Sequence, residues 1–157
     1  MTAQCVLNPT STLRPILVVE DNDMDLDFCL QAFDEHAIAN PVIACRDGED
    51  AIAFINLHGD PADREFPLLV LLDLRLPKID GIEVLRHARK QVNWHMMPFV
   101  VLTTSSQNTD IQAAYQQGVN SYIVKPVDFG KFSDVVKHIK LYWVLTNESP
   151  FAPLNGQ

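Results

Sequence analysis

Five short apolar runs, separated by longer segments of helical periodicity, constrain the fold of this chain most strongly. Each run holds four or five residues, which is ordinary for a strand but short for a helix. Nearly every residue in a run is apolar, which is typical of strands buried on both faces of a parallel sheet. Because such strands alternate with helices here, we predict a doubly wound α/β fold with a five-stranded parallel sheet and five helices. The runs are residues 16–19, 42–45, 68–72, 99–102 and 121–124.

The segments between the runs have the spacing of amphipathic helices. Residues 26–33 place apolar side chains at positions i, i+3, i+4 and i+7, and residues 111–118, which end in a glycine typical of a helix end, repeat the pattern. Residues 132–143 carry a further apolar stripe, which indicates one face of a last helix. Asp80 is placed to cap a helix start, with Glu83 three residues later to complete a capping box.

Composition and charge exclude several functions. The 157 residues suit one domain, for which we expect an N-terminal arm over 1–13, a folded domain over 14–145 and an irregular C-terminal tail over 146–157. A formal net charge of −8 without a run of lysine or arginine makes a poor nucleic-acid binder. No apolar stretch reaches membrane-spanning length and the chain does not begin with a signal peptide, so we expect a cytoplasmic protein. The cysteines and histidines show no disulfide or metal-ligand spacing.

Polar side chains with distinct chemistry follow four of the five runs, at the point where each predicted strand ends. Glu20 and Asp21 follow the first run, Asp73 the third, Thr103 the fourth and Lys125 the fifth. In doubly wound sheets, the carboxyl ends of the strands form the crevice in which ligands bind. We therefore expect three carboxylates, a hydroxyl and an ammonium to meet at one edge of the sheet.

This set of side chains predicts a metal-assisted phosphoryl site. Three carboxylates held close repel one another and raise one another's pKa unless a cation lies among them. A hard divalent ion such as Mg²⁺ accepts oxygen ligands and keeps waters that a phosphate can replace. Asp73 is then placed to attack phosphorus, Lys125 offers a point charge to a phosphoryl oxygen, and Thr103 offers a hydroxyl donor.

These residues lie in motifs that resemble the receiver domain of two-component response regulators. The matching motifs are ILVVEDN, LLDLRLPKIDGIEVL, VVLTTSS and SYIVKP, within roughly residues 14–144. Their order and spacing also match, with 30 residues from Asp73 to Thr103 and 22 from Thr103 to Lys125. The length and the ending LYWVLTNESP are similar, more narrowly, to the small regulators that serve phytochrome-type sensor kinases in cyanobacteria and other bacteria.

The resemblance implies a flavodoxin-like receiver fold over residues 14–145 and a phosphoryl group carried on Asp73. A sensor histidine kinase would supply that group from a phosphohistidine, with Mg²⁺ bound. The family pattern assigns the metal to Asp21, Asp73 and the backbone carbonyl of Arg75, with Glu20 acting through a coordinated water. The protein would be a phosphoacceptor switch rather than an enzyme, with at most self-catalysed phosphorylation and dephosphorylation.

The resemblance also implies how the switch works. Thr103 and Lys125 would contact the phosphoryl group, and Tyr122 would be the aromatic side chain that turns inward when Thr103 does. The peptide bond between Lys125 and Pro126 would be cis, both by the resemblance and because the turn must direct the lysine back at the site. A cis bond is a demanding expectation, since only about 5–6% of X–Pro bonds in folded proteins adopt it.

Two positions depart from the commonest pattern of the family. Glu20 is one methylene longer than the usual aspartate, which alters the geometry that a metal ion meets. Arg75 places a long cation two residues after the phosphoacceptor. Its guanidinium has three alternative positions: over the phosphate, paired with Glu20, or in an ordinary surface salt bridge.

Three other functions were weighed against the same residues. An aspartate-nucleophile phosphohydrolase uses an Asp-x-Asp pair, whereas this chain reads Asp73-Leu74-Arg75 and lacks the second acid. A flavin carrier of the same fold needs a phosphate-binding loop after the first strand, where the acidic EDND would repel phosphate. The alternative that stays open is a receiver-fold binding module that works by protein contact without phosphorylation.

The end of the last helix predicts a self-association surface. Trp143 continues the core stripe, but Leu141, Tyr142, Val144 and Leu145 point other ways around the same turns. A helix that is apolar on more than one face leaves an exposed patch unless another segment covers it. We expect a homodimer through this helix, the neighbouring fifth strand and the fourth helix. The alternative is a monomer in which the C-terminal tail folds over the patch.

Little chain follows the predicted receiver. After Val144 too few residues remain for a DNA-binding module, so we expect no output domain. The signal would then leave through the surface of the receiver itself, toward a downstream protein. No motif in the sequence identifies that protein, the kinase or the stimulus.

Overall fold

The computed structural model describes residues 3–7 and 12–154, with the backbone alone for residues 4–7. This described part contains the predicted five parallel strands in one sheet, in the order β3-β2-β4-β5-β6. The chain passes from β2 to β3 on one side of the sheet and from β4 to β5 on the other, and doubly wound sheets bind ligands at such a reversal. The strands are β2 (Ile16–Val19), β3 (Val42–Cys45), β4 (Leu69–Leu72), β5 (Phe99–Thr103) and β6 (Ser121–Val124).

A sixth strand, β1 (Gln4–Leu7), pairs antiparallel with β3 at the edge of the sheet. Its register sets Gln4 against Ala44 and Leu7 against Val42, with an irregularity in between. These residues fall in the predicted N-terminal arm, for which no strand was expected. Four residues carry too little periodicity to indicate one, and the pairing depends on the free edge that β3 offers.

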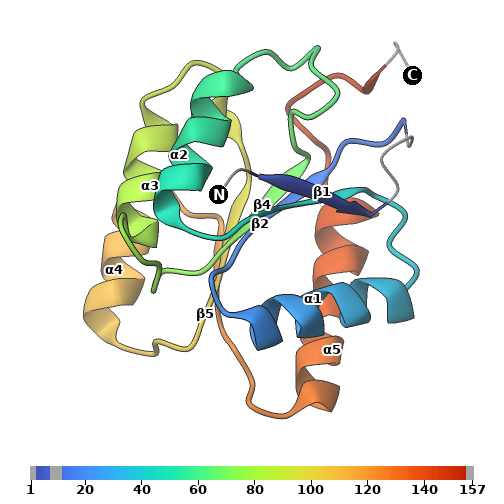
Figure 1. Ribbon diagram of the computed structural model, residues 1–157, viewed down its shortest axis with the longest axis vertical. Helices are drawn as coiled ribbons and strands as arrows, with labels where there is room; N and C mark the ends of the chain where they lie inside the picture. The colour runs from blue at the N-terminus through green and yellow to red at the C-terminus, as the bar shows by residue number, and fades with distance from the viewer. Residues whose placement is uncertain (1–2, 8–11, 155–157) are drawn as a thin grey trace.

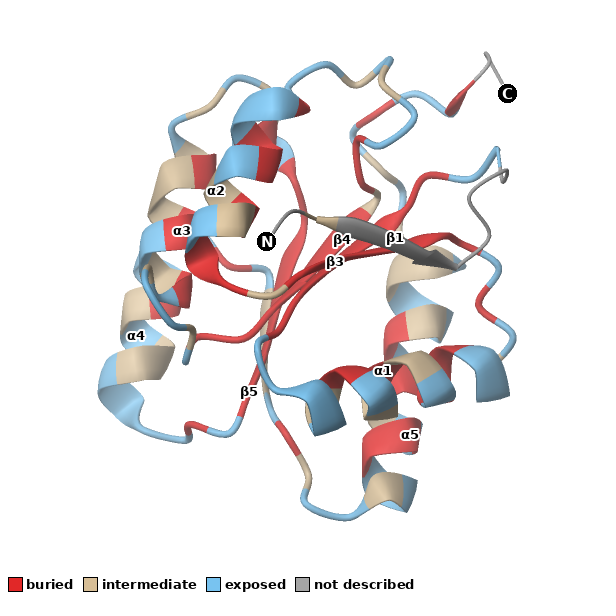
Figure 2. Ribbon diagram, in the orientation of Figure 1, coloured by how far each residue is buried: buried red, intermediate tan, exposed pale blue. Residues whose placement is uncertain are grey.

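Strands β2 to β5 are buried along their whole length (Figure 2). Their alternate residues fill two hydrophobic clusters on opposite faces of the sheet. In β2, for example, Leu17 and Val19 enter one cluster, and Ile16 and Val18 enter the other. Helices α2, α3 and α4 cover the first face, whereas α1 and α5 cover the second (Figure 1). The helices are α1 (Asp23–Glu35), α2 (Gly48–Leu57), α3 (Gly81–Arg89), α4 (Asn108–Gln116) and α5 (Phe129–Ile139).

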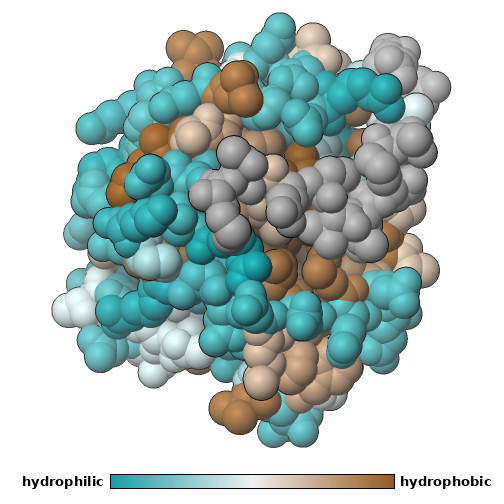
Figure 3. Space-filling model, viewed as in Figure 1, coloured by the Kyte–Doolittle hydropathy of each residue, from teal (hydrophilic) through white to brown (hydrophobic). Residues whose placement is uncertain are grey.

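The five α-helices of the described residues confirm the predicted fold class, and none of them is long and apolar enough to cross a bilayer. The Asp80 side chain accepts a hydrogen bond of 3.0 Å from the backbone N–H of Glu83, which confirms the predicted cap of α3. The Glu83 carboxylate itself pairs with Arg86 in the next turn. After α4, Gly118 has a φ of +77°, as expected at a helix end. The face of the molecule in Figure 3 is largely hydrophilic, in keeping with the net charge of −8.

The chain beyond α5 folds back against the amino ends of the strands. A π-helical turn, Lys140–Val144, extends α5 before the chain leaves the helix. Phe151 is buried with its ring centroid 4.7 Å from that of Phe66, in the loop before β4. The carbonyl of Ala152 accepts a hydrogen bond of 2.6 Å from Nη2 of Arg14. The tail is therefore irregular in conformation but packed against the domain.

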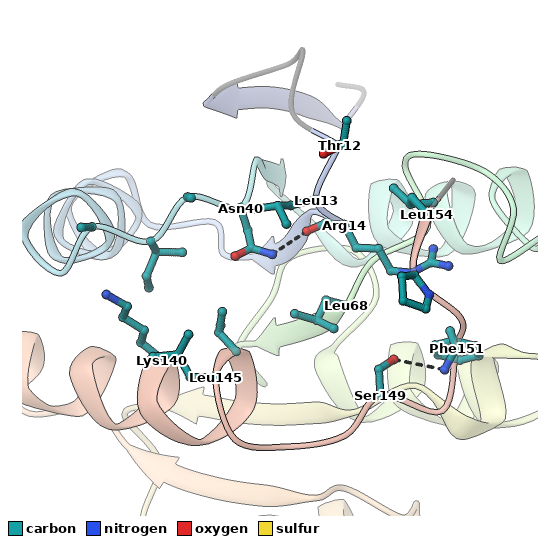
Figure 4. Close-up of a pocket in the computed structure, with 15 residues that line it drawn as sticks. Thr12, Leu13, Arg14, Asn40, Leu68, Lys140, Leu145, Ser149, Phe151 and Leu154 are labelled. Carbon is teal, nitrogen blue, oxygen red and sulfur yellow. Dashed lines mark hydrogen bonds between the residues drawn. The ribbon is translucent and has the colours of Figure 1, made fainter. Parts of the chain in front are cut away.

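A cavity of about 520 Å³ lies between this tail and the segments that lead into β2, β3 and β4 (Figure 4). Leu68, Leu145 and Phe151 contribute apolar surface, and Arg14 and Lys140 are the charged residues in the lining. Both cations donate to backbone carbonyls. Because the cavity is at the amino ends of the strands, it lies at the opposite edge of the sheet from the predicted acidic crevice.

Gly48, the first residue of α2, lies very close to the backbone of the loop before α3. A Cβ added there would lie 1.8 Å from the backbone oxygen of Ile79. We predict that Gly48→Ala lowers the free energy of unfolding by about 1–3 kcal/mol, because the neighbouring backbone has to move. Gly59→Ala is the matched control, since nothing lies within 4 Å of its added Cβ. Urea denaturation measures both variants, and equal stabilities would contradict the prediction.

Candidate functional site

The hydrogen-bond ladder of the sheet continues one residue beyond three of its strands and aligns the predicted site residues. Glu20 N donates to the last carbonyl of β3 (2.9 Å), and Asp73 N donates to the last carbonyl of β2 (3.0 Å). Lys125 N donates to the last carbonyl of β5 (2.7 Å). The backbone thus holds these three residues at adjacent strand ends, with their side chains at the carboxyl edge of the sheet.

Lys125 compensates the charge of the acids around it. Its Nζ lies 3.0 Å from Oδ2 of Asp73, 2.9 Å from Oδ2 of Asp25 and in direct contact with Oε1 of Glu20. Lys125, Glu20 and Asp73 are each less than a tenth exposed. Burial opposes the charge of the ammonium, but its contacts with Glu20 and Asp73 outweigh this effect and raise the pKa of Lys125. A buried carboxylate at the end of an apolar strand is tolerated here because a cation touches it.

The predicted cis bond between Lys125 and Pro126 is wrong, because no cis peptide bond occurs in the described part of the chain. The trans form is the intrinsic preference of an X–Pro bond by about 0.5–1 kcal/mol. The long lysine side chain reaches Glu20, Asp25 and Asp73 from the trans backbone. No cis turn is needed to direct it at the site.

Glu20 and Asp73 titrate as a pair. Burial, together with the negative charge of Asp73, raises the pKa of Glu20 to about 8. Burial also opposes ionisation of Asp73, but hydrogen bonding with Glu20 and the charge of Lys125 outweigh it and lower the pKa of Asp73. The backbone N–H of Arg75 donates a further hydrogen bond of 3.1 Å to Oδ1 of Asp73. The surroundings of the pair therefore favour ionisation of Asp73 over ionisation of Glu20.

The acids also form a set suited to a hard divalent cation. Glu20, Asp21 and Asp73 each offer a carboxylate oxygen, and the three oxygens lie within 4.8 Å of one another. Asp21 is exposed, whereas the other two are buried, so the set opens toward solvent on one side. All-oxygen ligands and room for water are what Mg²⁺ prefers, and a cation there would replace the proton that the buried pair shares. The residues present fit such an ion.

Two contributors to the site were not anticipated. Arg46, after β3, donates from Nε to the carbonyl of Glu20 (3.1 Å) and from Nη2 to the carbonyl of Asp21 (3.0 Å), and it also pairs with Asp23. It therefore clamps the backbone that carries the acid pair. Asp25 adds a third carboxylate around the lysine.

Thr103 and Tyr122 lie beside the acids on neighbouring strands. Thr103 ends β5 and is completely buried. Tyr122 on β6 is half-buried, and its hydroxyl donates a hydrogen bond of 2.9 Å to the backbone carbonyl of Ser105. Burial raises the pKa of Tyr122. The aromatic side chain is thus tied to the loop that follows Thr103.

Arg75 occupies one of its three alternative positions. Its guanidinium pairs with Oδ2 of Asp110 in α4 at 2.8 Å, and its side chain is 60% exposed. In this structure it forms a surface salt bridge and does not pair with Glu20. The same Asp110 carboxylate accepts a hydrogen bond from the Ser105 hydroxyl. Asp110 therefore connects the loop after β4 with the loop after β5.

Known proteins are similar to this chain in both sequence and structure. The family model described as the response regulator receiver domain matches residues 16–137. The probable methanogenesis regulatory protein FilR2 of Methanothrix harundinacea is 41% identical over 135 residues, which cover 86% of each chain. The crystal structure of the phosphorylated cyanobacterial phytochrome response regulator RcpA superposes with a TM-score of 0.80 at 36% identity and covers 87% of this chain and 97% of that one.

A further solved relative holds a metal ion. The Mn²⁺-bound form of response regulator Rcp1, a protein of Synechocystis, has a TM-score of 0.78 at 35% identity and covers 87% of this chain and 98% of that chain. A divalent ion in that protein agrees with the chemistry of the donor set described above. With the family model matched over most of the length, the chain belongs to the response regulator receiver domain family.

Proposed function

We propose that this protein is a response regulator that accepts a phosphoryl group on Asp73 from a phosphohistidine of a sensor histidine kinase. The observation that carries the proposal is the contact of one buried ammonium, that of Lys125, with both Asp73 and Glu20 at the carboxyl edge of the sheet. Asp73 is the acid of this group that ends a central strand and is held ionised. It is therefore the carboxylate best prepared to act as nucleophile.

The transfer exchanges one bond of phosphorus for another. An oxygen of Asp73 forms the new P–O bond as the P–N bond of the kinase phosphohistidine breaks, and the departing imidazole nitrogen keeps the electron pair. The Nζ of Lys125 lies 3.0 Å from Oδ2 of Asp73. It is therefore close enough to stabilise the negative charge of a phosphoryl oxygen once the group is on Asp73. The N–H of Arg75 keeps the carboxylate oriented through Oδ1. The protein is in this view a switch whose chemistry is limited to its own phosphorylation and dephosphorylation.

Mg²⁺ is the cofactor that we propose for this step. Asp21, Asp73 and the backbone carbonyl of Arg75 would hold it, with Glu20 acting through a coordinated water. The bound ion supplies positive charge that offsets the charge of the phosphoryl group. Arg46 contributes by holding the backbone carbonyls of Glu20 and Asp21, which keeps the two acids in place before an ion arrives.

The kinase is proposed to be of the phytochrome type. Support comes from the similarity to RcpA, whose structure is described as that of a phytochrome response regulator, over 87% of this chain. The resemblance of the ending LYWVLTNESP to small phytochrome regulators points the same way. The downstream partner is proposed to be a protein that recognises the altered surface of the receiver.

Phosphorylation is proposed to act through Thr103 and Tyr122. A phosphoryl group on Asp73 would draw the Thr103 hydroxyl toward it and vacate space that Tyr122 fills. The hydrogen bond from the Tyr122 hydroxyl to the Ser105 carbonyl, 2.9 Å long, ties this movement to the loop before α4. Such a rearrangement would shift the equilibrium between two positions of α4 and β6, as modifications do in other two-state switches.

A homodimer is proposed through the π-helical turn after α5, together with β6 and α4. Leu141, Tyr142 and Leu145 are 46%, 52% and 64% exposed, so the tail that packs on Phe66 leaves these side chains accessible. On β6, Val124 is also exposed. Burying such side chains contributes roughly 25 cal/mol per Å², against the cost of association. A two-fold interface would use the same surface from both chains.

The phosphoacceptor is tested by labelling with a small acyl phosphate in the presence of Mg²⁺. We predict that Asp73→Asn abolishes the acid-labile labelling, because the amide cannot form the acyl phosphate, and that chelation of Mg²⁺ abolishes it in wild type. Asp27→Asn, on the exposed side of α1, is the control and should label as wild type does. Labelling of Asp73→Asn at the wild-type level would refute the assignment, and unlabelled wild type would favour the phosphorylation-independent binding module.

The switch is tested by NMR with beryllofluoride, which on an aspartate oxygen stands in for the phosphoryl group. We predict that the ring signals of Tyr122 shift in wild type but stay fixed in Thr103→Val, which keeps the shape of the side chain and removes its hydroxyl. Thr104→Val provides the control because Thr104 is exposed. If Tyr122 responds equally in both variants, Thr103 does not drive the movement.

The dimer is tested by light scattering over a concentration series, with and without the phosphate mimic. We predict the mass of two chains for wild type at high concentration and a single-chain mass for Tyr142→Glu, because a buried charge without a partner opposes association. Val92→Glu is the control, since Val92 is 77% exposed away from this surface. A wild-type mass of one chain at every concentration would rule the dimer out.

A further inference from the structure

A histidine and two carboxylates meet in the insert between α2 and β4, which runs along the top of the view in Figure 1. His58 follows the last turn of α2, and Asp63 and Glu65 lie farther along the insert. Nδ1 of His58 is 2.6 Å from Oδ2 of Asp63, and Nε2 is 3.3 Å from Oε2 of Glu65. Because the insert leads into the amino end of β4, this cluster lies at the opposite edge of the sheet from Asp73.

The ring of His58 cannot satisfy both acids in its neutral form. A neutral imidazole carries one N–H, so one of its two nitrogens presents a lone pair to a carboxylate oxygen. This contact repels unless positive charge is added at the cluster. Two additions remove the repulsion: a second proton on the ring, or a metal cation bound by the ring nitrogen and the carboxylates together.

The imidazole is fixed, whereas the acids can adjust. The side chain of His58 is 11% exposed, its ring centroid is 4.3 Å from that of Phe54, and its backbone carbonyl accepts a hydrogen bond of 2.7 Å from Nε1 of Trp94. The side chains of Asp63 and Glu65 are 33% and 54% exposed. A ligand set of one rigid and two adjustable groups closes around an ion without moving the core.

Space for an ion and its waters adjoins the cluster. A cavity of about 240 Å³ is lined by His58, Glu65 and Phe54, among others. One ligand atom from each of His58, Asp63 and Glu65 lies within 4.8 Å of the others, so small rotations of the exposed acids suffice to bring them to one centre. Histidine spacing could not reveal this site, because its other two ligands are carboxylates.

We propose that His58, Asp63 and Glu65 form a second divalent metal site, which takes a transition-metal ion such as Zn²⁺ with water completing its coordination. Imidazole nitrogen selects such ions over Mg²⁺, whereas the acids around Asp73 offer only oxygen. The two ends of the sheet thus bind metals of different chemistry. The ion fastens the insert to the end of α2 and, through the His58 carbonyl, to Trp94.

The test is titration of the untagged full-length protein with Zn²⁺ in excess Mg²⁺, followed by calorimetry and by the thermal unfolding temperature. We expect one equivalent of Zn²⁺ to bind and to raise the unfolding temperature of wild type. His58→Gln and Glu65→Gln should each weaken binding at least tenfold, a loss that is common even for residues behind the ligands. His95→Gln, which alters an exposed histidine, is the matched control and should bind as wild type does.

Two further measurements fix the location of the ion. Glu65 is half exposed, so Glu65→Gln keeps a readable result if His58→Gln folds poorly. In Asp21→Asn, where the acids around Asp73 are weakened, Zn²⁺ binding should persist, and the NMR signals of the His58 ring should shift on titration. Absence of Zn²⁺ binding, equal affinity in all variants, or loss of binding in Asp21→Asn would overturn the proposal.

Discussion

The ammonium of Lys125 is the charge on which the arrangement of the site depends. Unit charges 4 Å apart attract by about 4 kcal/mol at an effective dielectric constant of 20, which is comparable to the cost of burying a carboxylate. By touching Glu20 and Asp73, the lysine joins the ends of β2, β4 and β6 at one edge of the sheet. Its charge also favours the ionised form of Asp73. The contact that joins the strand ends is therefore the one that keeps Asp73 charged despite its burial.

Much of the fold could be predicted from the sequence because local patterns encode it. The five apolar runs are short and uninterrupted, so each matches a strand to within a residue, and the cap at Asp80 is formed by residues three positions apart. The strand β1 was not predicted because it forms by pairing with β3, and its own composition does not indicate a strand. The packing of Phe151 on Phe66 joins residues far apart in sequence, and no periodicity reports such a contact.

The site, like the fold, has some features that local sequence patterns encode and others that depend on contacts between distant residues. Glu20, Asp73 and Lys125 were found because each directly follows an apolar run, and parallel strands bring their carboxyl ends together. Arg46 also follows a run, but its role depends on the reach of its guanidinium to the carbonyls of the neighbouring strand end. The role of Asp25 depends on the direction in which α1 leaves the sheet. The roles of Arg46 and Asp25 both depend on distances between different helices and strands, and such distances cannot be read from spacing in the sequence.

Asp110 links the proposed phosphorylation site with the proposed output surface on α4 and β6. Its carboxylate joins Arg75, two residues after Asp73, with Ser105, whose carbonyl holds Tyr122 on the outer strand. Coupling between two sites is reciprocal, so a rearrangement at Asp73 that changes the affinity for a partner at α4 or β6 is itself changed by that partner to the same degree. Under the proposed function, a protein bound on this face would therefore alter how readily Asp73 keeps its phosphoryl group. The lifetime of the signal would then belong to the complex rather than to the receiver alone.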